Sequence, residues 1–231
     1  MKIKSQEKVW DDIAPEWHEY KQKPSENAVE FLKKSYGNVL DLGSGSGRHL
    51  TKIKKGKMFL LDFSKEMLEL AKEKSIKEKI PAEFIKSELD KIPEPDEFFD
   101  FAIYVSALHC VETSKKRKKS VDELYRVLKK GAKAYIGVWN KNSKRFNKKE
   151  NKERLIGWTN KGERYYYLFD EGEVHELFRS VGFKIILTQN SEMMINFCNL
   201  FFCVFLQAES LQQFGMDKFS TGPTGISRRQ K

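Results

Sequence analysis

Short apolar runs alternate along this chain with segments whose apolar residues recur at helical spacing. The runs predict buried strands at 39–42, 58–62, 82–86, 98–105 and 134–139. Two more strands, at 183–188 and 197–206, are predicted to follow each other as a hairpin. Strands separated by helices are typical of right-handed crossovers. The pattern therefore predicts an α/β fold with a mainly parallel sheet, helices on both faces and a C-terminal antiparallel hairpin.

The predicted helices have recognisable starts and stops. The first precedes the sheet and carries Val9, Ile13, Trp17 and Tyr20 on one face, where it could cover the core or close over a ligand. Others are predicted after the caps Ser25, Ser64 and Thr113 or Ser114, and over 174–181. The last two of these helices are expected to stop at Gly131 and Gly182.

Residues 140–162 interrupt the alternation because they are polar and basic. Between Lys141 and Arg164, nine Lys or Arg residues stand against three Glu residues, a local charge of +6. The tail after 206 contains the sequence GPTG and has basic character. We therefore expect one domain over 1–206, with a basic insertion loop at 141–163 and a disordered tail at 207–231.

The overall charge is +10, with 43 Lys and Arg against 33 Asp and Glu. This excess favours a polyanionic partner such as nucleic acid, although lysine-rich proteomes have the same balance without one. Cys110, Cys198 and Cys203 show no C-x-x-C spacing and lie in apolar surroundings, which is typical of reduced thiols. No signal peptide is evident and no apolar run reaches the roughly 20 residues that span a bilayer, so a cytoplasmic protein without a membrane partner is expected.

Residues 39–50, VLDLGSGSGRHL, are the most informative stretch. Gly43, Gly45 and Gly47 follow a strand at alternate positions, and 49–53 are expected to begin a helix. Glycines let a ligand approach the backbone, and unpaired helix N–H groups attract an anion, so a nucleotide-like ligand is predicted. The dinucleotide fingerprint G-x-G-x-x-G would need glycine where this chain has Arg48, which makes a nicotinamide oxidoreductase a distant alternative.

Acidic residues near the ends of the next two strands complete the predicted nucleotide site. Asp62 ends the second strand, where a carboxylate can hold a ribose diol; its alternative role is a helix cap. Ser87 and Glu88 follow the third strand, where an acid can accept from an adenine amino group, or can be a solvated loop acid. The fourth strand runs into His109, at the edge where ligands bind in such sheets. This position favours a role in the substrate site, although many histidines are structural.

The pattern Asp-x-Gly-x-Gly-x-Gly from Asp41 to Gly47 resembles motif I of the class I S-adenosylmethionine-dependent methyltransferases. Other segments resemble the tRNA wobble-uridine methyltransferases, over about residues 5–200. These segments are 9–15 (VWDDIAP), 23–24 (KP), 99–103 (FDFAI) leading to His109, 164–169 (RYYYLF) and 171–173 (EGE). The resemblance implies a seven-stranded Rossmann-like sheet, S-adenosyl-L-methionine as cofactor, and esterification of 5-carboxymethyluridine to 5-methoxycarbonylmethyluridine in the anticodon loop.

The resemblance also implies roles for individual residues. The cofactor would lie on Asp41, Gly43, Gly45, Gly47, Asp62, Ser87 and Glu88. Arg164, with Tyr165 and His109, would surround the acceptor uridine, and a structural role stays open for Tyr166. A carboxylate acceptor has a pKa of about 4 and is already ionised at neutral pH. It therefore needs a group that positions it, such as a guanidinium that binds it bidentately, rather than a strong base. No nucleophile motif, P-loop or metal-ligand cluster is apparent.

The implied partners are the tRNA anticodon loop and a small zinc-binding activator subunit that covers an apolar sheet edge. Residues 141–161 and 115–119 would contact phosphates, unless they are solvated loops. The chain departs from the family at Ser25-Glu26, where an aromatic residue and a proline are common, near Lys21, where an arginine is common, and after Asn196-Phe197. A methyltransferase for a small molecule and a catalytically silent RNA-binding subunit remain alternatives.

Overall fold

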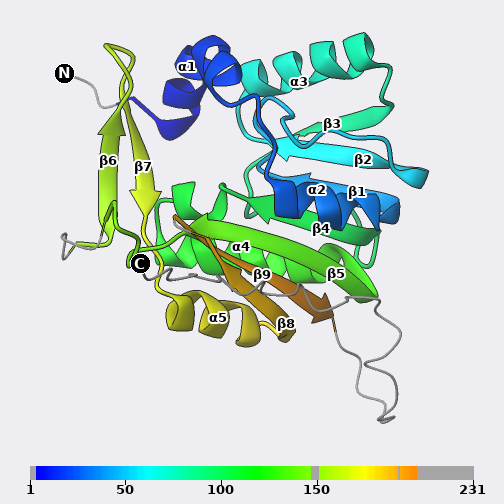
Figure 1. The fold of residues 1–231 in the computed structure, drawn as a ribbon. Coiled ribbons are helices and arrows are strands. Elements are labelled where there is room, and N and C mark those ends of the chain that lie inside the picture. Colours follow the sequence, from blue (N-terminus) through cyan, green and yellow to red (C-terminus); the bar gives the residue numbers. More distant parts are fainter. Residues whose placement is uncertain (1–3, 147–150, 192, 202–231) are drawn as a thin grey trace, which may run out of the picture.

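The computed structural model describes residues 4–146, 151–191 and 193–201, and Figure 1 shows a sheet with helices packed against its two faces. Its strands run in the order β3-β2-β1-β4-β5-β9-β8. They are β1 (Tyr36–Leu42), β2 (Lys54–Asp62), β3 (Ala82–Lys86), β4 (Phe99–Val105), β5 (Leu128–Trp139), β8 (Phe183–Asn190) and β9 (Met194–Phe201). The first five are parallel, and β9 is antiparallel to β5 and β8. The predicted fold is thus confirmed, while 202–206 and the tail lie outside the described residues.

The described residues also form five α-helices and one short 3-10 helix, and the first two α-helices precede the first strand. These helices are α1 (Gln6–Tyr20), α2 (Glu26–Lys33), α3 (Lys65–Glu78), η1 (Leu108–Cys110), α4 (Ser114–Val127) and α5 (Glu171–Arg179). Ser64 and Thr113 cap α3 and α4 as predicted, each accepting a backbone N–H three residues later. Ser25 precedes α2 but makes no side-chain cap. None of the described helices is long and apolar enough to cross a membrane.

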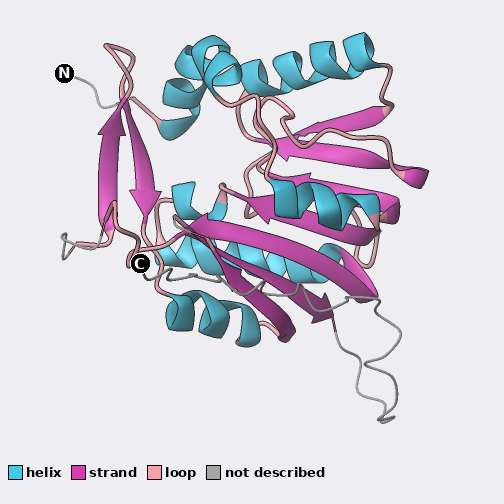
Figure 2. Ribbon diagram, in the orientation of Figure 1, coloured by secondary structure: helices cyan, strands magenta, loops and turns pink. Residues whose placement is uncertain are grey.

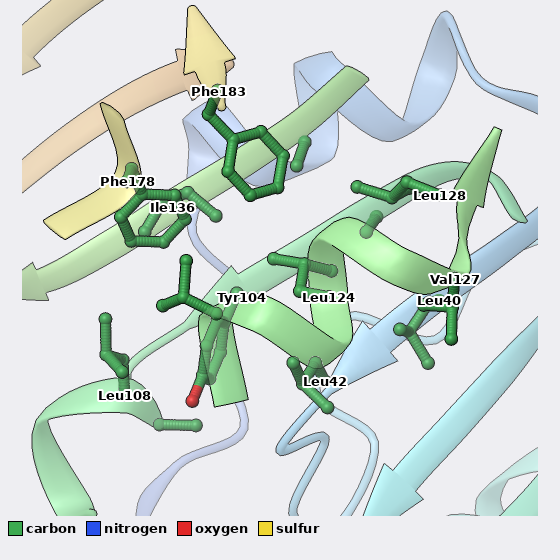
Figure 3. Close-up of a cluster of buried hydrophobic side chains, with 14 of the residues drawn as sticks. Leu40, Leu42, Tyr104, Leu108, Leu124, Val127, Leu128, Ile136, Phe178 and Phe183 are labelled. Atoms are coloured by element: carbon green, nitrogen blue, oxygen red, sulfur yellow. The ribbon is translucent and has the colours of Figure 1, made fainter. Parts of the chain in front are cut away.

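Successive apolar side chains of the central strands point to opposite faces of the sheet, so both faces are apolar. Figure 3 shows the face that packs on α4 and α5, with Leu40 and Tyr104 of the sheet against Leu124. The other face packs on α2 and α3 through Ala28, Leu32, Val39, Leu60 and Ala71. Burial of each large side chain stabilises the fold by about 1.5–3 kcal/mol. Because these strands are parallel, their carboxyl ends lie at one edge of the sheet, and the helices packed on both faces fix the sheet in place.

Two predicted helix boundaries are wrong. No helix forms at 49–53, because the buried His49 accepts the Ser25 N–H at Nε2 and the chain turns directly into β2. A tertiary contact, rather than a helix, therefore anchors this segment. Gly131 does not end α4, since β5 begins at Leu128 and Gly131, at φ +78°, lies inside that strand, opposite an irregularity in the β4–β5 register.

The basic insertion is also more ordered than the predicted loop. Part of it forms β6 (Glu153–Gly157), which pairs antiparallel with β7 (Glu163–Tyr167). Figures 1 and 2 show this pair standing beside α1, on the side toward which β2 and β5 point. Gln6 of α1 joins the pair to the helix, since its side chain donates to the Glu163 carbonyl and accepts the Tyr165 N–H. Helix α1 and the hairpin therefore lie together over the carboxyl edge of the sheet.

Candidate active site

A pocket lies where the carboxyl ends of β1, β2, β4 and β5 meet α1 and β7. Its lining includes Trp10, Trp17, Lys21, Gly43, Gly45, Arg48, Asp62, Glu88, Ser106, His109, Cys110, Trp139 and Tyr166. In open parallel sheets this edge is where ligands bind. The pocket brings together Gly43, Gly45, Asp62, Glu88 and His109 of the predicted site residues.

The glycine turn forms the floor of the pocket next to β1. Gly43 has φ +74°, and a Cβ there would approach the Cβ of Ala107 to 2.2 Å, so only glycine fits. Gly45 also has a positive φ, +53°, but no atom lies within 4 Å of the position of its missing Cβ. The backbone at Gly45 therefore faces open space, as a ligand that approaches the bare main chain requires.

Asp62 lies beside this turn with both carboxylate oxygens fixed by the backbone. Oδ2 accepts the Gly45 N–H at 2.8 Å and Oδ1 accepts the Ser64 N–H at 2.9 Å. Each oxygen keeps a lone pair, and the side chain lines the pocket, so a ribose diol fits this carboxylate. Burial raises the pKa of Asp62 to about 6, while its backbone hydrogen bonds oppose the shift.

Helix α1 is tied to the same carboxylate through one intervening residue. The Ser64 hydroxyl donates to Oδ1 of Asp11 at 2.6 Å, and the Ser64 N–H donates to Asp62. Asp11 also accepts the Glu66 N–H at 3.3 Å. These hydrogen bonds therefore fix the position of α1, which lines the pocket, relative to the candidate ribose site.

The other predicted cofactor residues occupy different environments. Asp41 is buried beneath the turn, outside the pocket lining, where burial raises its pKa to about 7 and its Oδ2 has no hydrogen-bond partner. Gly47, also outside the lining, packs on α3, since a Cβ there would lie 3.1 Å from that of Ala71. Ser87 donates its N–H to the Asp62 carbonyl, away from the pocket, and Glu88 lines the pocket as an exposed side chain.

His109 is placed by η1 with its ring against the end of β5. Its Nδ1 accepts the Trp139 N–H at 3.1 Å, and the two rings are stacked with centroids 4.9 Å apart. In the neutral ring Nε2 then carries the proton. Burial lowers the pKa of His109 to about 3, helped by the charges of Arg48 and Lys21. His109 is therefore a neutral hydrogen-bond donor at physiological pH, not a base.

The alternating residues of β7 separate Arg164 and Tyr165, which were predicted to act together. Arg164 lies buried among aromatic rings and donates to the Tyr166 hydroxyl at 2.8 Å. Tyr166 lines the pocket and stacks on Trp139, with centroids 4.3 Å apart. The Tyr165 hydroxyl instead donates to a Glu153 oxygen, outside the pocket lining. The structure therefore brings Tyr166, rather than Tyr165, to His109, and the acceptor roles of Arg164 and Tyr165 stay predictions.

Two cationic side chains of the pocket were not predicted. Arg48 donates to the Ser106 hydroxyl at 3.1 Å, and burial lowers its pKa. Lys21 is half-buried, and burial with the charges of Arg48, Arg145 and Arg164 lowers its pKa. Arg48 follows the glycine turn in the sequence, which could have indicated a place in the pocket. Its position was considered only as the one where the dinucleotide fingerprint requires glycine. Lys21 marked only a departure from the family pattern.

Some residues of the predicted phosphate-binding surface have other partners. Arg117 is buried, donates to the Val111 carbonyl and stacks on the Tyr167 ring at 3.9 Å, because it lies on the inward face of α4. Lys152 pairs with Asp170 and Glu173, and Lys161 pairs with Glu16. Among the described residues of these two segments, Lys115, Lys116 and Lys119 of α4, and Lys144 and Arg145 after β5, are exposed and form no ion pair. Residues 147–150 lie outside the described chain.

The known proteins that this chain resembles include methyltransferases. The methyltransferase domain family matches residues 40–136. A Schizosaccharomyces pombe protein named tRNA (carboxymethyluridine(34)-5-O)-methyltransferase is 27% identical over 207 residues, covering 77% of this chain and 88% of the relative. An uncharacterized protein of Methanocaldococcus jannaschii is 30% identical over 188 residues, covering 77% of this chain and 82% of the relative.

Solved structures of S-adenosylmethionine-dependent methyltransferases share this fold. One similar structure is a complex of the Haloferax volcanii Trm112 methyltransferase activator with a protein described as a methyltransferase. The match has a TM-score of 0.66 and 18% sequence identity, and covers 88% of this chain and 100% of that one. At this identity the likeness concerns the fold alone.

Proposed function

This chain belongs to the class I S-adenosylmethionine-dependent methyltransferases, and we propose that it esterifies the carboxymethyl group of a wobble uridine in tRNA. S-adenosyl-L-methionine is its cofactor. The observation that carries the proposal is a pocket lined by the cations Lys21 and Arg48 and by His109, whose pKa is too low for a base. The name of the fission-yeast relative supports the same substrate.

The cofactor half of the pocket would bind and orient the nucleoside. We assign the ribose diol to Asp62 and the close backbone approach to Gly43 and Gly45. When bound, the sulfonium supplies an already activated methyl group. Gly47 contributes by packing on α3, and Asp41 lies beneath the turn as a buried acid near Arg48. Ser87 and Glu88 remain our candidates for the adenine side.

The acceptor half would position an anion rather than remove a proton. A carboxylate is ionised at neutral pH, so it can attack a methyl group without a base. His109 lines the pocket and carries its proton on Nε2, because Nδ1 accepts the Trp139 N–H, and Lys21 and Arg48 supply positive charge near the ring. Alignment of the two reacting atoms is then the main task of the protein. A hydroxyl or amine acceptor would need a base, and the lowered pKa of His109 argues against that role for its ring.

We extend the proposal to the domain and its partners. Residues 1–206 would form the methyltransferase domain, and the exposed lysines of α4, including Lys116 at the pocket, would contact phosphates of the anticodon loop. A small zinc-binding activator subunit would cover an apolar edge of the sheet. Support for such a partner comes from the Haloferax complex, whose methyltransferase component shares this fold.

The test is transfer of labelled methyl from S-adenosylmethionine to tRNA that carries 5-carboxymethyluridine, with and without a zinc-ribbon activator. Nucleoside mass spectrometry should find the methyl ester at the wobble position, and tRNA with unmodified uridine is the control. Cofactor binding without transfer to either RNA would overturn the proposal in favour of a small-molecule acceptor. Absence of cofactor binding would overturn it in favour of a silent subunit.

A further inference from the structure

Three aromatic side chains form a surface cluster at the junction of α1 and the β6–β7 turn, which we name the aromatic platform: Trp17, Tyr20 and Trp158. The ring centroids of Trp17 and Trp158 are 5.5 Å apart, and those of Tyr20 and Trp158 are 5.6 Å apart. Tyr20 is 66% exposed although its ring contacts both tryptophans. The platform therefore combines a fixed position with an open aromatic surface.

The aromatic platform is continuous with the acceptor half of the pocket. Trp17 lines the pocket and contacts both other members of the platform. Lys21, the residue that follows Tyr20 at the C-terminal cap of α1, also lines the pocket. On the inner side, Trp17 meets Trp10, whose ring lies 5.2 Å away and belongs to the same lining. A polymer whose reacting unit occupied the pocket would therefore have this platform within reach of its neighbouring unit.

Two cationic side chains, Lys21 and Arg164, lie beside the rings of the aromatic platform. The Lys21 ammonium lies 5.3 Å from the Tyr20 centroid and 5.8 Å from that of Trp17. The Arg164 guanidinium lies 4.8 Å from the Trp158 centroid on its buried side. Within the described ranges neither cation forms an ion pair with a carboxylate, while nearby Glu16 is paired with Lys161. The platform thus suits a ligand that offers a flat ring together with an anionic group.

We propose that the aromatic platform binds the base that flanks the acceptor nucleotide in a single-stranded RNA loop, with Lys21 near the intervening phosphate. Bases of unpaired RNA stack on exposed aromatic side chains, and cations beside those rings favour the phosphate backbone. Stacking accepts any base, so this site would strengthen RNA binding without reading sequence. The inference rests on the proposed function for its substrate, and it names a subsite outside the reacting centre.

The experiment compares Tyr20→Ala and Tyr20→Trp with the wild-type protein. Tyr36→Ala is the matched control, because Tyr36 is another exposed tyrosine, 58% accessible, at the start of β1. Fluorescence anisotropy measures binding of an unmodified anticodon stem-loop, so the readout does not need turnover. We expect Tyr20→Ala to weaken binding about tenfold, and Tyr20→Trp and Tyr36→Ala to bind as the wild type does.

A kinetic measurement separates this subsite from the reacting centre. With the free nucleoside 5-carboxymethyluridine as acceptor, Tyr20→Ala should turn over as the wild type does, whereas KM for the modified stem-loop should rise about tenfold with kcat unchanged. Unchanged stem-loop binding by Tyr20→Ala would overturn the platform even if methyl transfer succeeds. If the wild type transfers no methyl group to tRNA but Tyr20→Ala still weakens stem-loop binding, the proposed reaction is wrong and the platform is supported.

Discussion

The two halves of the pocket are built in different ways. The cofactor half comes from short turns that follow consecutive strands, and its polar contacts, such as Gly45 to Asp62, use the backbone. The acceptor half is assembled from α1, η1, the end of β5 and the hairpin strand β7, and depends on side chains stacked on one another. The cofactor half is therefore held mainly by backbone contacts within one sheet edge, whereas the stacked cluster of the acceptor half depends on each of its side chains.

The difference predicts which changes affect one half and spare the other. Mutations of the cofactor half should abolish binding of the cofactor, and mutations of the acceptor half should lower turnover with the cofactor still bound. Asp11 is the exception, since it joins α1 to Ser64 and through it to Asp62. The following experiments test this division.

The largest effect is expected for Asp62→Ala. The variant loses the carboxylate proposed to hold the ribose diol, so affinity for S-adenosylmethionine should fall about a hundredfold or more, as expected for two charged hydrogen bonds. Isothermal titration calorimetry measures it, with Asp122→Ala on the exposed face of α4 as the control. Unchanged affinity would refute the ribose assignment.

Arg164→Ala should keep cofactor affinity and lose about a hundredfold in turnover. The guanidinium is surrounded by rings of both α1 and the hairpin, with its carbon 5.1 Å from the Trp17 centroid and 5.4 Å from that of Tyr166. Its removal leaves the aromatic cluster without its central cation, and each mispositioned contact at a reacting centre is costly. Single-turnover assays at saturating cofactor check this, and normal methylation would remove Arg164 from the acceptor site.

A paired change on β7 tests which face of that strand serves the reaction. Tyr166→Phe removes the hydroxyl that Arg164 contacts and should lower turnover about tenfold, as for loss of one charged hydrogen bond. Tyr165→Phe removes contacts to Glu153 and Arg117 outside the pocket and should stay within about twofold. The reverse ranking in the same assay would restore Tyr165 to the acceptor site.

The smallest effect on cofactor affinity is expected from pH. Asp62 has a raised pKa of about 6 in the free protein, and the ionised carboxylate is the form that would bind the diol. Cofactor affinity should therefore fall as pH drops through 6, about fourfold between pH 7 and 5.5. His109, with a pKa lowered to about 3, stays neutral and should add no inflection to turnover across this range. An inflection near 6.5 that His109→Gln removes would contradict the assignment of a neutral donor.

The fold, and the position of Gly43, Gly45 and Asp62 at the pocket, could be predicted from the sequence because these residues follow strands whose apolar pattern is clear. Asp41, Gly47 and Ser87 lie outside the pocket lining, and the cofactor roles of all these residues stay predictions.

The turn at 49–53 was mispredicted since a distant contact, His49 to Ser25, decides it. The acceptor half depends on tertiary contacts as well. Which face of β7 meets the pocket depends on the packing of β7 against α1 and η1, which the sequence pattern of β7 does not show. The partner strand β6 was not predicted either, because its sequence is part of a polar segment.

The cations around the acceptor have a consequence for the turnover cycle. In the proposed reaction the sulfonium and the carboxylate both become neutral, so Lys21 and Arg48 face an anion before methyl transfer and an ester after it. Two unit charges 4 Å apart near a protein surface attract by about 4 kcal/mol, and the ester forfeits that attraction. If the proposed reaction is correct, the pocket would bind the unreacted acid more tightly than the finished ester, and this difference would limit inhibition by product.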